Sequence, residues 1–311
     1  MVPWIMVLLM GLWIWRNKQK QRHNSIYRNF HYNEDQFAKY GSIGLLYNNT
    51  AGNKNAWLLA YQISKRIKNT TYIDSRRIAE GWDALIIVGG DGTIHDAINK
   101  LTKQETHIYV VPAGTSNAIA TSLGIRDYYD AFCGKVKYIR PLEANGKQCV
   151  LSVSSGFIAD HDYYSDIVFR SWTRLRMFLA DVYVVLFSKE CDFQISWGNH
   201  HQFHDSYFLF HVTKMPFVTS TLIANKHQLP DKDDFSVIYI DKRPANILKD
   251  FLQLSHFQSL EALSHCHVLK SQDSITVISG KRCQWSLDGN VEELSCVVIG
   301  LSNKRFAFVC P

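Results

Sequence analysis

The sequence contains no pair of cysteines at the two-residue spacing that binds zinc or forms a redox motif. Its seven cysteines are scattered over 311 residues, and an odd number does not indicate a disulfide framework. A chain of this length also needs no covalent cross-links to build a core. We interpret all seven as free thiols in a reducing compartment: Cys133, Cys149, Cys191, Cys266, Cys283, Cys296 and Cys310.

Internal repeats, low-complexity tracts and recognisable nucleic-acid-binding motifs are absent as well. The hydrophobic fraction is 46% and the charged fraction 20%, so the chain has the composition of a globular protein with room for two domains. The net charge of +6 predicts a mildly cationic surface that suits anionic nucleotides and lipid headgroups. Because only charge would suggest nucleic acid, we do not predict it as a partner.

The N-terminus lacks the order of a secretory signal. Residues 2–15 are continuously apolar, and the basic cluster at residues 16–22 follows this run instead of preceding it. As a helix, the run reaches about 21 Å, short of the roughly 30 Å hydrocarbon core. We predict membrane association with the rest of the chain on the cytoplasmic side, through a short span or an interfacial helix. A soluble protein with an apolar start is the alternative.

Residues 1–40 comprise the expected anchor and a connector. The hydrophobic pattern that follows predicts an α/β nucleotide-binding domain over residues 41–140. Apolar runs at 42–47, 84–88 and 108–111 read as buried strands, each followed by a loop of small residues. Helical spacing follows at 56–67 and 94–101. Unbroken apolar strands that alternate with helices indicate a three-layer domain with a parallel central sheet.

From residue 141 to 311 the pattern changes to short strands separated by turns, which predicts an antiparallel β-sandwich. Helices are expected at 167–187 and 244–254. The strands are expected at 149–153, 193–197, 207–212, 235–240, 274–278, 297–301 and 306–309.

Three loops at the carboxyl ends of the first domain's strands are candidates for binding phosphate. Ligands of open α/β sheets bind at these ends, and glycine lets backbone N–H groups turn toward an anion. The helix that starts near Thr93 adds the positive end of its dipole. The candidate ATP-binding residues in these loops are Asn48, Gly52, Gly89, Gly90, Gly92, Thr93, Gly114, Thr115 and Asn117.

Four motifs resemble a known family. GGDGTIHDAIN at 89–99 and PAGTSNA at 112–118 are similar to the loops of diacylglycerol, sphingosine and ceramide kinases, although NAD kinases and phosphofructokinases carry a related GGDG loop. GFIADHD at 156–162 resembles sphingosine kinases, and Leu287-Asp288-Gly289 resembles the family's DGE motif. The resemblance runs from about residue 42 to 309. It implies a nucleotide domain and a β-sandwich lipid domain, with ATP and Mg²⁺ in the cleft between them.

The aspartates of these motifs are the candidate catalytic and metal-binding residues. Phosphoryl transfer to an alcohol needs a carboxylate that receives the hydroxyl proton, and Mg²⁺ takes one or two carboxylates beside phosphate oxygens. Asp91 and Asp288 could supply both roles, and the sequence does not separate base from metal ligand. A capping aspartate at 91 and an ordinary Asp-Gly turn at 288 are the structural alternatives.

The resemblance to sphingosine kinases implies binding roles for two arginines and two aspartates. Arg170 and Arg176 match phosphate-binding arginines of that family, although with Arg174 they could also form a solvated helix face. Asp162 matches the residue that would hold the amino and hydroxyl head of a sphingoid base, and Asp160 is a near alternative. Either aspartate could instead be a surface acid. The histidines, including those at 95 and 161, show no metal-ligand spacing and are interpreted as surface or packing residues.

Several positions depart from the family pattern. Only 36 residues separate Gly52 from Gly89, so one element between them is expected to be trimmed. The other departures are residues 48–52 in place of NPxxG, Asp96 for Glu, Ser116 for a Gly with positive φ, and Asn290 for the Glu of DGE.

These observations predict an ATP-dependent lipid kinase that phosphorylates the hydroxyl of a long-chain lipid, preferably a sphingoid base, at a membrane surface. A diacylglycerol or ceramide kinase is the first alternative. The second alternative is a catalytically silent lipid- or nucleotide-binding protein, which the departures at Ser116 and Asn290 favour.

Deleting residues 1–15 should move the protein from the membrane pellet to the soluble fraction, because this apolar run is the expected anchor. Fractionation and immunoblotting measure the shift, and activity on detergent-dispersed lipid should persist. A full-length protein found wholly in the soluble fraction contradicts the prediction.

Overall fold

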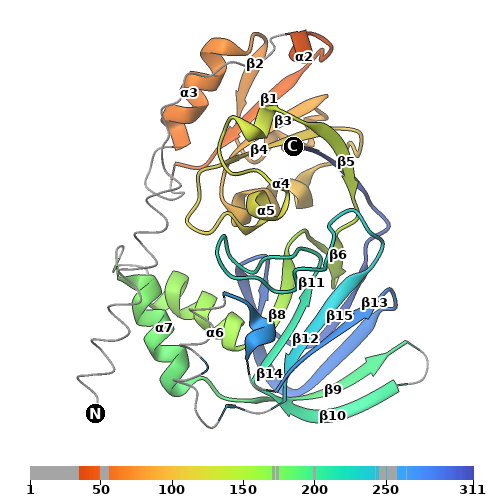
Figure 1. Cartoon of the computed structure of the whole chain (residues 1–311). Coiled ribbons are helices and arrows are strands. Elements are labelled where there is room, and N and C mark those ends of the chain that lie inside the picture. The colour runs from red at the N-terminus through yellow and green to blue at the C-terminus, as the bar shows by residue number, and fades with distance from the viewer. Residues whose placement is uncertain are drawn as a thin grey trace.

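In the computed structural model two domains lie one above the other (Figure 1). The chain passes from the first domain to the second and returns to the first at its end. It describes residues 35–49, 56–169, 172, 175–198, 201–241, 243–244, 250, 258–263 and 265–311. The expected anchor and most of the expected helix at 244–254 lie outside these residues. Within the described ranges, no helix combines the length and the apolar character needed to cross a membrane.

The first domain is built on a six-stranded sheet with the order β2-β1-β3-β4-β16-β5, in which the central strand β3 is fully buried. Strands β1 to β4 and β16 pair in parallel, while β5 pairs antiparallel to β16. The predicted parallel sheet is therefore confirmed. The strands are β1 (Ile43–Tyr47), β2 (Thr70–Ile73), β3 (Ala84–Gly89), β4 (His107–Pro112), β5 (Lys135–Ile139) and β16 (Phe306–Cys310).

Helices of this domain bury one apolar face against the sheet. On α3 the buried residues follow the helical period, at Ala56, Leu59, Ala60 and Ile63. Between α3 and β3 the chain has only the short edge strand β2 and one 3₁₀ turn, which accounts for the trimmed spacing. The helices are α2 (Asp35–Ala38), α3 (Ala56–Arg66), η1 (Arg77–Glu80), α4 (Asp91–Lys100), α5 (Ala118–Ser122) and η2 (Asp130–Phe132).

The second domain is one ten-stranded antiparallel sheet that folds over itself. Strand β14 pairs with β9 through its first half and with β8 through its last residues, with a bulge between Ile278 and Cys283. Phe193 of β9 and Phe210 of β11, two strands that do not pair with each other, lie 6.0 Å apart in the enclosed core. The antiparallel prediction is confirmed, and its two layers are continuous through β14.

The strands of this sheet come in three groups along the chain. The first is β6 (Leu142–Ala144), β7 (Lys147–Cys149) and β8 (Ser152–Gly156). The second is β9 (Cys191–Trp197), β10 (His201–Tyr207), β11 (Leu209–Thr213) and β12 (Phe235–Ile240). The third is β13 (Cys266–Ser271), β14 (Ile275–Leu287) and β15 (Asn290–Leu301), with the 3₁₀ turn η4 (Leu260–Ala262) before it.

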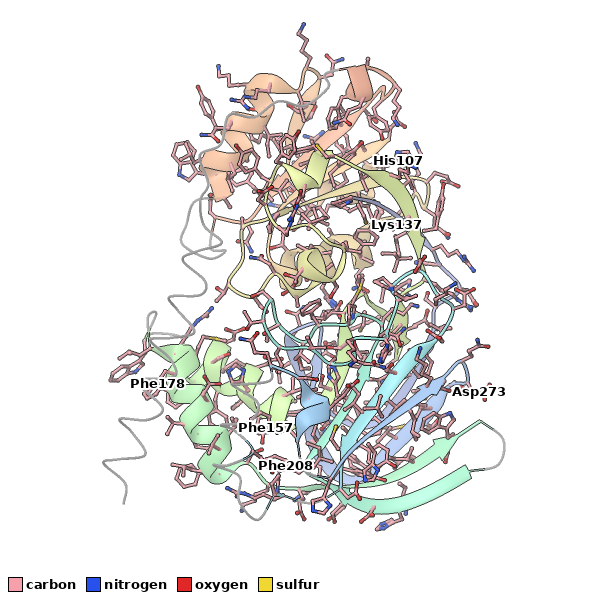
Figure 2. The ribbon with its side chains drawn as sticks, viewed as in Figure 1. His107, Lys137, Phe157, Phe178, Phe208 and Asp273 are labelled. Atoms are coloured by element: carbon pink, nitrogen blue, oxygen red, sulfur yellow. The ribbon has the colours of Figure 1, made fainter. Side chains whose placement is uncertain are left out.

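Three consecutive helical segments flank one side of this sheet: α6 (Phe157–Tyr163), the π-helical turn η3 (Tyr164–Val168) and α7 (Arg176–Phe187). The sequence predicted one helix over 167–187 and was wrong about its start. Figure 2 shows Phe157 of α6 beside Phe208, and their rings lie 5.4 Å apart. Gly156 joins β8 to α6 at φ +74°, where a Cβ would lie 2.4 Å from the carbonyl oxygen of Phe208. Only glycine fits this sharp entry into α6.

The chain crosses from the first sheet to the second between Ile139 and Leu142, and it returns at its end. The strand expected at 306–309 in the second domain is β16, which lies between β4 and β5 of the first sheet. The predicted domain range 141–311 is therefore wrong at this end. All five residues of β16 are buried, as for a strand covered on both faces.

Phe308→Ala should lower the free energy of unfolding by about 3–5 kcal/mol, because it leaves a cavity in the first domain's core. Chemical denaturation measures the loss. Val298→Ala on the exposed face of β15 is the control and should cost less than about 1 kcal/mol. Equal effects of the two variants would argue against the placement of β16.

Candidate functional site

Two of the predicted phosphate loops touch through their backbones. A Cβ added to Gly114 would lie 2.3 Å from the Cα of Gly90, and one added to Gly90 would lie 2.9 Å from the Cα of Gly114. Neither position tolerates a side chain while the loops keep this distance. The two glycines therefore bring the end of β3 and the end of β4 together.

Hydrogen bonds fix both loops. Asn117 adopts positive φ (+53°), accepts a bond from the N–H of Gly114 at 2.8 Å and donates its amide to the Gly114 carbonyl at 2.9 Å. Ser116 is not among the positive-φ residues of the described chain, so its replacement of glycine causes no backbone strain. In the other loop, the amide of Asn48 donates to the Thr93 hydroxyl at 3.1 Å. Helix α4 begins at Asp91 without a side-chain cap, which leaves its N-terminus available to an anion.

Asp91 links the loops through its carboxylate. Its two oxygens accept the N–H groups of Ala118 and Ile119 at the start of α5, at 3.0 and 2.9 Å. Burial, with a smaller contribution from the charges of Asp288 and Asp162, raises the pKa of Asp91 to about 6 against the effect of these bonds. The capping alternative is thus correct for Asp91. Each oxygen keeps a second lone pair, so capping does not exclude catalysis or metal binding.

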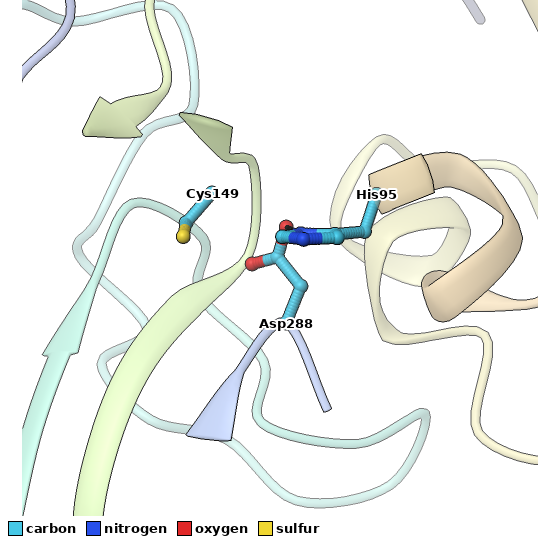
Figure 3. Close-up of side chains that lie close together, drawn as sticks. All are labelled: His95, Cys149 and Asp288. Carbon is cyan, nitrogen blue, oxygen red and sulfur yellow. Dashed lines mark hydrogen bonds and ion pairs between the residues drawn. The ribbon is translucent and has the colours of Figure 1, made fainter. Parts of the chain in front are cut away.

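Asp288 lies in the turn between β14 and β15 with both oxygens occupied. They accept the backbone N–H groups of residues 150, 151 and 152 at 2.8–2.9 Å, and Oδ2 lies 3.1 Å from Nδ1 of His95 (Figure 3). Its own φ is +52°. Four donors fill the four lone-pair positions of a carboxylate. This geometry does not support the predictions of Asp288 as base or metal ligand. Instead, Asp288 ties its own turn to residues 150–152 and to His95 of the first domain, and we call this set of contacts the tie.

His95 on α4 brings the first domain to this tie. Its side chain is 8% exposed, and burial opposes its charge, but Asp288 outweighs that effect and raises the pKa of His95. Asn99, one turn later, donates to the Gln148 carbonyl at 2.9 Å and accepts the Gln148 N–H at 2.8 Å. The interpretation of His95 as a surface or packing residue is wrong, because its ring bonds the buried carboxylate of Asp288 across the domain boundary. Sequence spacing carries no signal for this contact.

Cys149 lies beside His95 and Asp288, and ligand atoms of the three residues are within 4.8 Å of one another (Figure 3). A metal ion there would displace the hydrogen bond between His95 and Asp288. Burial and the neighbouring carboxylates of Asp288 and Glu292 also raise the pKa of the Cys149 thiol well above its ordinary value. A neutral thiol and a saturated carboxylate do not make a metal site.

The two aspartates of α6 face different partners. Asp162 accepts a hydrogen bond from the Ser286 hydroxyl of β14 at 2.5 Å, and its charge acts on Asp91. Asp160 accepts a bond from the hydroxyl of Ser188, beyond the end of α7. The structure therefore brings Asp162 toward the phosphate loops, whereas Asp160 holds α7. Ser286 was not predicted, since a serine in a strand gives no sequence signal.

The remaining predicted site residues have different outcomes. Gly52 and Arg170 lie outside the described residues. Arg176 opens α7 and pairs with Asp166 at 2.9 Å, so a partner carboxylate already occupies its guanidinium. Thr115 is an exposed residue of the second phosphate loop. The Asn290 amide oxygen lies 3.8 Å from the Cβ position of Gly92, which places residue 290 against the first phosphate loop.

Comparison with known proteins finds a family that the first domain resembles. Residues 42–143 match the family described as diacylglycerol kinase catalytic domain. This segment contains both glycine-rich loops and Asp91. No curated protein matches the chain in sequence.

Solved structures resemble the chain over both domains. A Bacillus anthracis str. Sterne protein assigned as a diacylglycerol kinase is 17% identical, with a TM-score of 0.67, over 88% of this chain and 98% of its own. A diacylglycerol kinase structure from the same organism is 15% identical with a TM-score of 0.59, over 88% and 98%. An NAD kinase from Archaeoglobus fulgidus in complex with ATP is 13% identical with a TM-score of 0.50, over 86% and 93%. At these identities the resemblance establishes the two-domain fold.

If Asp91 is the general base, kcat/KM should fall as the pH drops through about 6, because only the deprotonated carboxylate accepts a proton. Initial rates between pH 5 and 8 measure this limb. Asp91→Asn should remove the limb and lower turnover by at least ~10²-fold. If Asp91 instead contacts Mg²⁺, raising the Mg²⁺ concentration should move the limb to lower pH.

Asp127→Asn is the matched control. Asp127 also accepts two backbone N–H groups, from Tyr129 and Asp130, but it lies in an exposed turn after α5. It should keep the wild-type rate and the wild-type limb. An Asp91→Asn protein that is folded and nearly fully active would remove Asp91 from the mechanism.

Proposed function

We propose that this protein is an ATP-dependent lipid kinase that phosphorylates the hydroxyl of a sphingoid base. One observation carries the proposal: the charge of Asp162, on the flank of the second domain, raises the pKa of Asp91 in the phosphate loops. A kinase needs its base near the phosphates and its acceptor beside that base. The match of residues 42–143 to a diacylglycerol kinase catalytic domain supports the lipid acceptor.

The nucleotide half of the reaction rests on the two loops. Backbone N–H groups of residues 90–92, at the open N-terminus of α4, would hold the phosphates, and the second loop packs against them through Gly114. Mg²⁺ is usually coordinated by phosphate oxygens, waters and one or two carboxylates. Asp91 has a free lone pair on each oxygen, so it fits the role of such a carboxylate. The ion would neutralise the phosphate charge that develops during transfer. Asp288 does not fit as a second ligand.

The acceptor half rests on Asp162. A sphingoid base carries an ammonium group next to the hydroxyl that is phosphorylated, whereas diacylglycerol and ceramide have no cation there. A carboxylate oriented by Ser286 and held near Asp91 favours the cationic headgroup. Asp91 would then take the hydroxyl proton, since a pKa of about 6 keeps it deprotonated at neutral pH.

Membrane attachment belongs to the same proposal. The apolar run at residues 2–15 and the basic residues after it would hold the catalytic domains at the cytoplasmic face, where a long-chain substrate resides.

Incubation of the full-length protein with labelled ATP and a panel of sphingoid base, diacylglycerol and ceramide tests the function. We expect phosphorylated sphingoid base as the main product. A main product from a neutral lipid would assign the protein to the diacylglycerol or ceramide kinases. Binding of Mg-ATP without any labelled lipid would make it a silent binding protein, as the asparagine at position 290 would suggest.

Asp162→Asn should lower kcat/KM for the sphingoid base by roughly 10- to 10³-fold, because it removes the partner of the ammonium group. Activity on neutral lipids and the KM for ATP should change little. Asp160→Asn is the control, since Asp160 bonds Ser188, and it should show no substrate-dependent loss. Equal losses on charged and neutral lipids would mean that Asp162 does not contact the ammonium.

A further inference from the structure

His161 lies between the two helices that flank the second domain, and the function proposed above gives it no role. Its Nδ1 is 3.6 Å from Oδ1 of Asp162 on α6, and its Nε2 is 3.3 Å from Oδ1 of Asp181 on α7. The side chains of His161 and Asp181 are each 15% exposed, and that of Asp162 is 25% exposed. Both ring nitrogens thus face a carboxylate in a largely desolvated position.

Two carboxylates on opposite sides of one ring favour the doubly protonated imidazolium, because only that form carries a positive charge. Burial opposes the charge, but attraction from Asp162 and Asp181 outweighs it and raises the pKa of His161 to about 9. The ring is therefore a buried cation at neutral pH. The interpretation of this histidine as a surface or packing residue is wrong.

Other groups near the ring complete the charge pattern. Asp166 of η3 interacts with both His161 and Asp162, and Arg176 at the start of α7 pairs with Asp166 at 2.9 Å. From β14, the uncharged Ser286 contacts the other oxygen of Asp162. A second connection between α6 and α7 is the bond from Ser188 to Asp160. Polar contacts therefore join the two helices at separate points, one at His161 and one at Asp160.

We propose that His161 is a positioning residue of the acceptor site: its imidazolium joins Asp162 to Asp181, and thereby fixes the headgroup carboxylate and α7 in one arrangement. Ser286 bonds one oxygen of Asp162 and the His161 ring attracts the other, so the two contacts together fix the orientation of the carboxylate. The role in catalysis rests on the proposed function, whereas the charged bridge itself does not.

The bridge is tested first in the protein without lipid or nucleotide. Nitrogen-15 NMR of labelled histidine rings, with His161→Gln to assign the signal, should find His161 doubly protonated at pH 8. Asp181→Asn should lower its pKa. A ring that is neutral at pH 7 overturns the proposal, whatever lipid the protein phosphorylates.

Thermal unfolding gives a second measure. The pKa of His161 is raised in the folded state, so its stabilising contribution is largest below the unfolded value near 6.5 and disappears as the pH rises through about 9. The Tm difference between wild type and His161→Gln should therefore shrink between pH 7 and 9.

His211→Gln is the matched control for both measures. His211 is also fully buried, but burial lowers its pKa to about 3, and its ring nitrogen bonds the Ser154 hydroxyl at 2.7 Å. Its variant should lose stability by an amount that stays constant between pH 7 and 9. A constant difference for His161→Gln as well would overturn the charged bridge.

Kinetics then separate positioning from a purely structural role. His161→Gln should lower kcat/KM for the sphingoid base by roughly 10- to 10²-fold, as expected when a reacting group is misplaced, with the KM for ATP unchanged. The double variant with Asp181→Asn should be no worse than His161→Gln alone, because both remove the same bridge.

Suppose that the wild-type ring is charged. The positioning role is then overturned if His161→Gln has the wild-type kcat/KM, or if the losses of kcat/KM from His161→Gln and Asp181→Asn add fully in the double variant. A wild-type protein that phosphorylates no lipid would contradict the proposed function instead. The ring charge and the Tm differences would then decide the bridge on their own.

Discussion

The carboxylate of Asp288 receives hydrogen bonds from both halves of the molecule, and the geometry of the site depends on it. Three successive N–H groups, of residues 150 to 152, bond the carboxylate within the second domain, and His95 reaches it from α4 of the first. Removing either partner of such a buried, charged contact leaves the other unpaired at considerable cost. Helix α4 begins at Asp91, so the tie that holds its middle also sets the distance from Asp91 to Asp162.

The site consists of separately fixed parts from two domains. In the first domain, Gly90 and Gly114 let the loops touch, and Asp91 joins them by capping α5. In the second domain, Ser286 and His161 hold Asp162 on α6. Each carboxylate is oriented by donors before any substrate arrives, which is the preorganisation that phosphoryl transfer requires. The tie at Asp288 connects the two parts.

Local patterns predicted most of the fold, but not the long-range contacts of the site. Strands such as Ala84–Gly89 were predictable because burial on both faces leaves an unbroken apolar run. Edge strand β2 was missed because it is short and half exposed. The run Phe306–Cys310 is as continuous as that of β3, and this signal for the parallel sheet was overlooked. The phosphate loops and Asp91 follow from motifs, whereas Asp288 and His161 act through partners on other elements, which no spacing specifies.

The position of β16 has a consequence for biosynthesis. Strands β4 and β5 do not pair with each other; each pairs with β16, about 170 residues downstream of β5. A nascent chain that has emerged from the ribosome only as far as residue 300 can form the second sheet, but its first sheet still has a gap between those strands. The nucleotide-binding half, although made first, can therefore complete its core only after the other half has been synthesised, and vectorial domain-by-domain folding is not open to this chain.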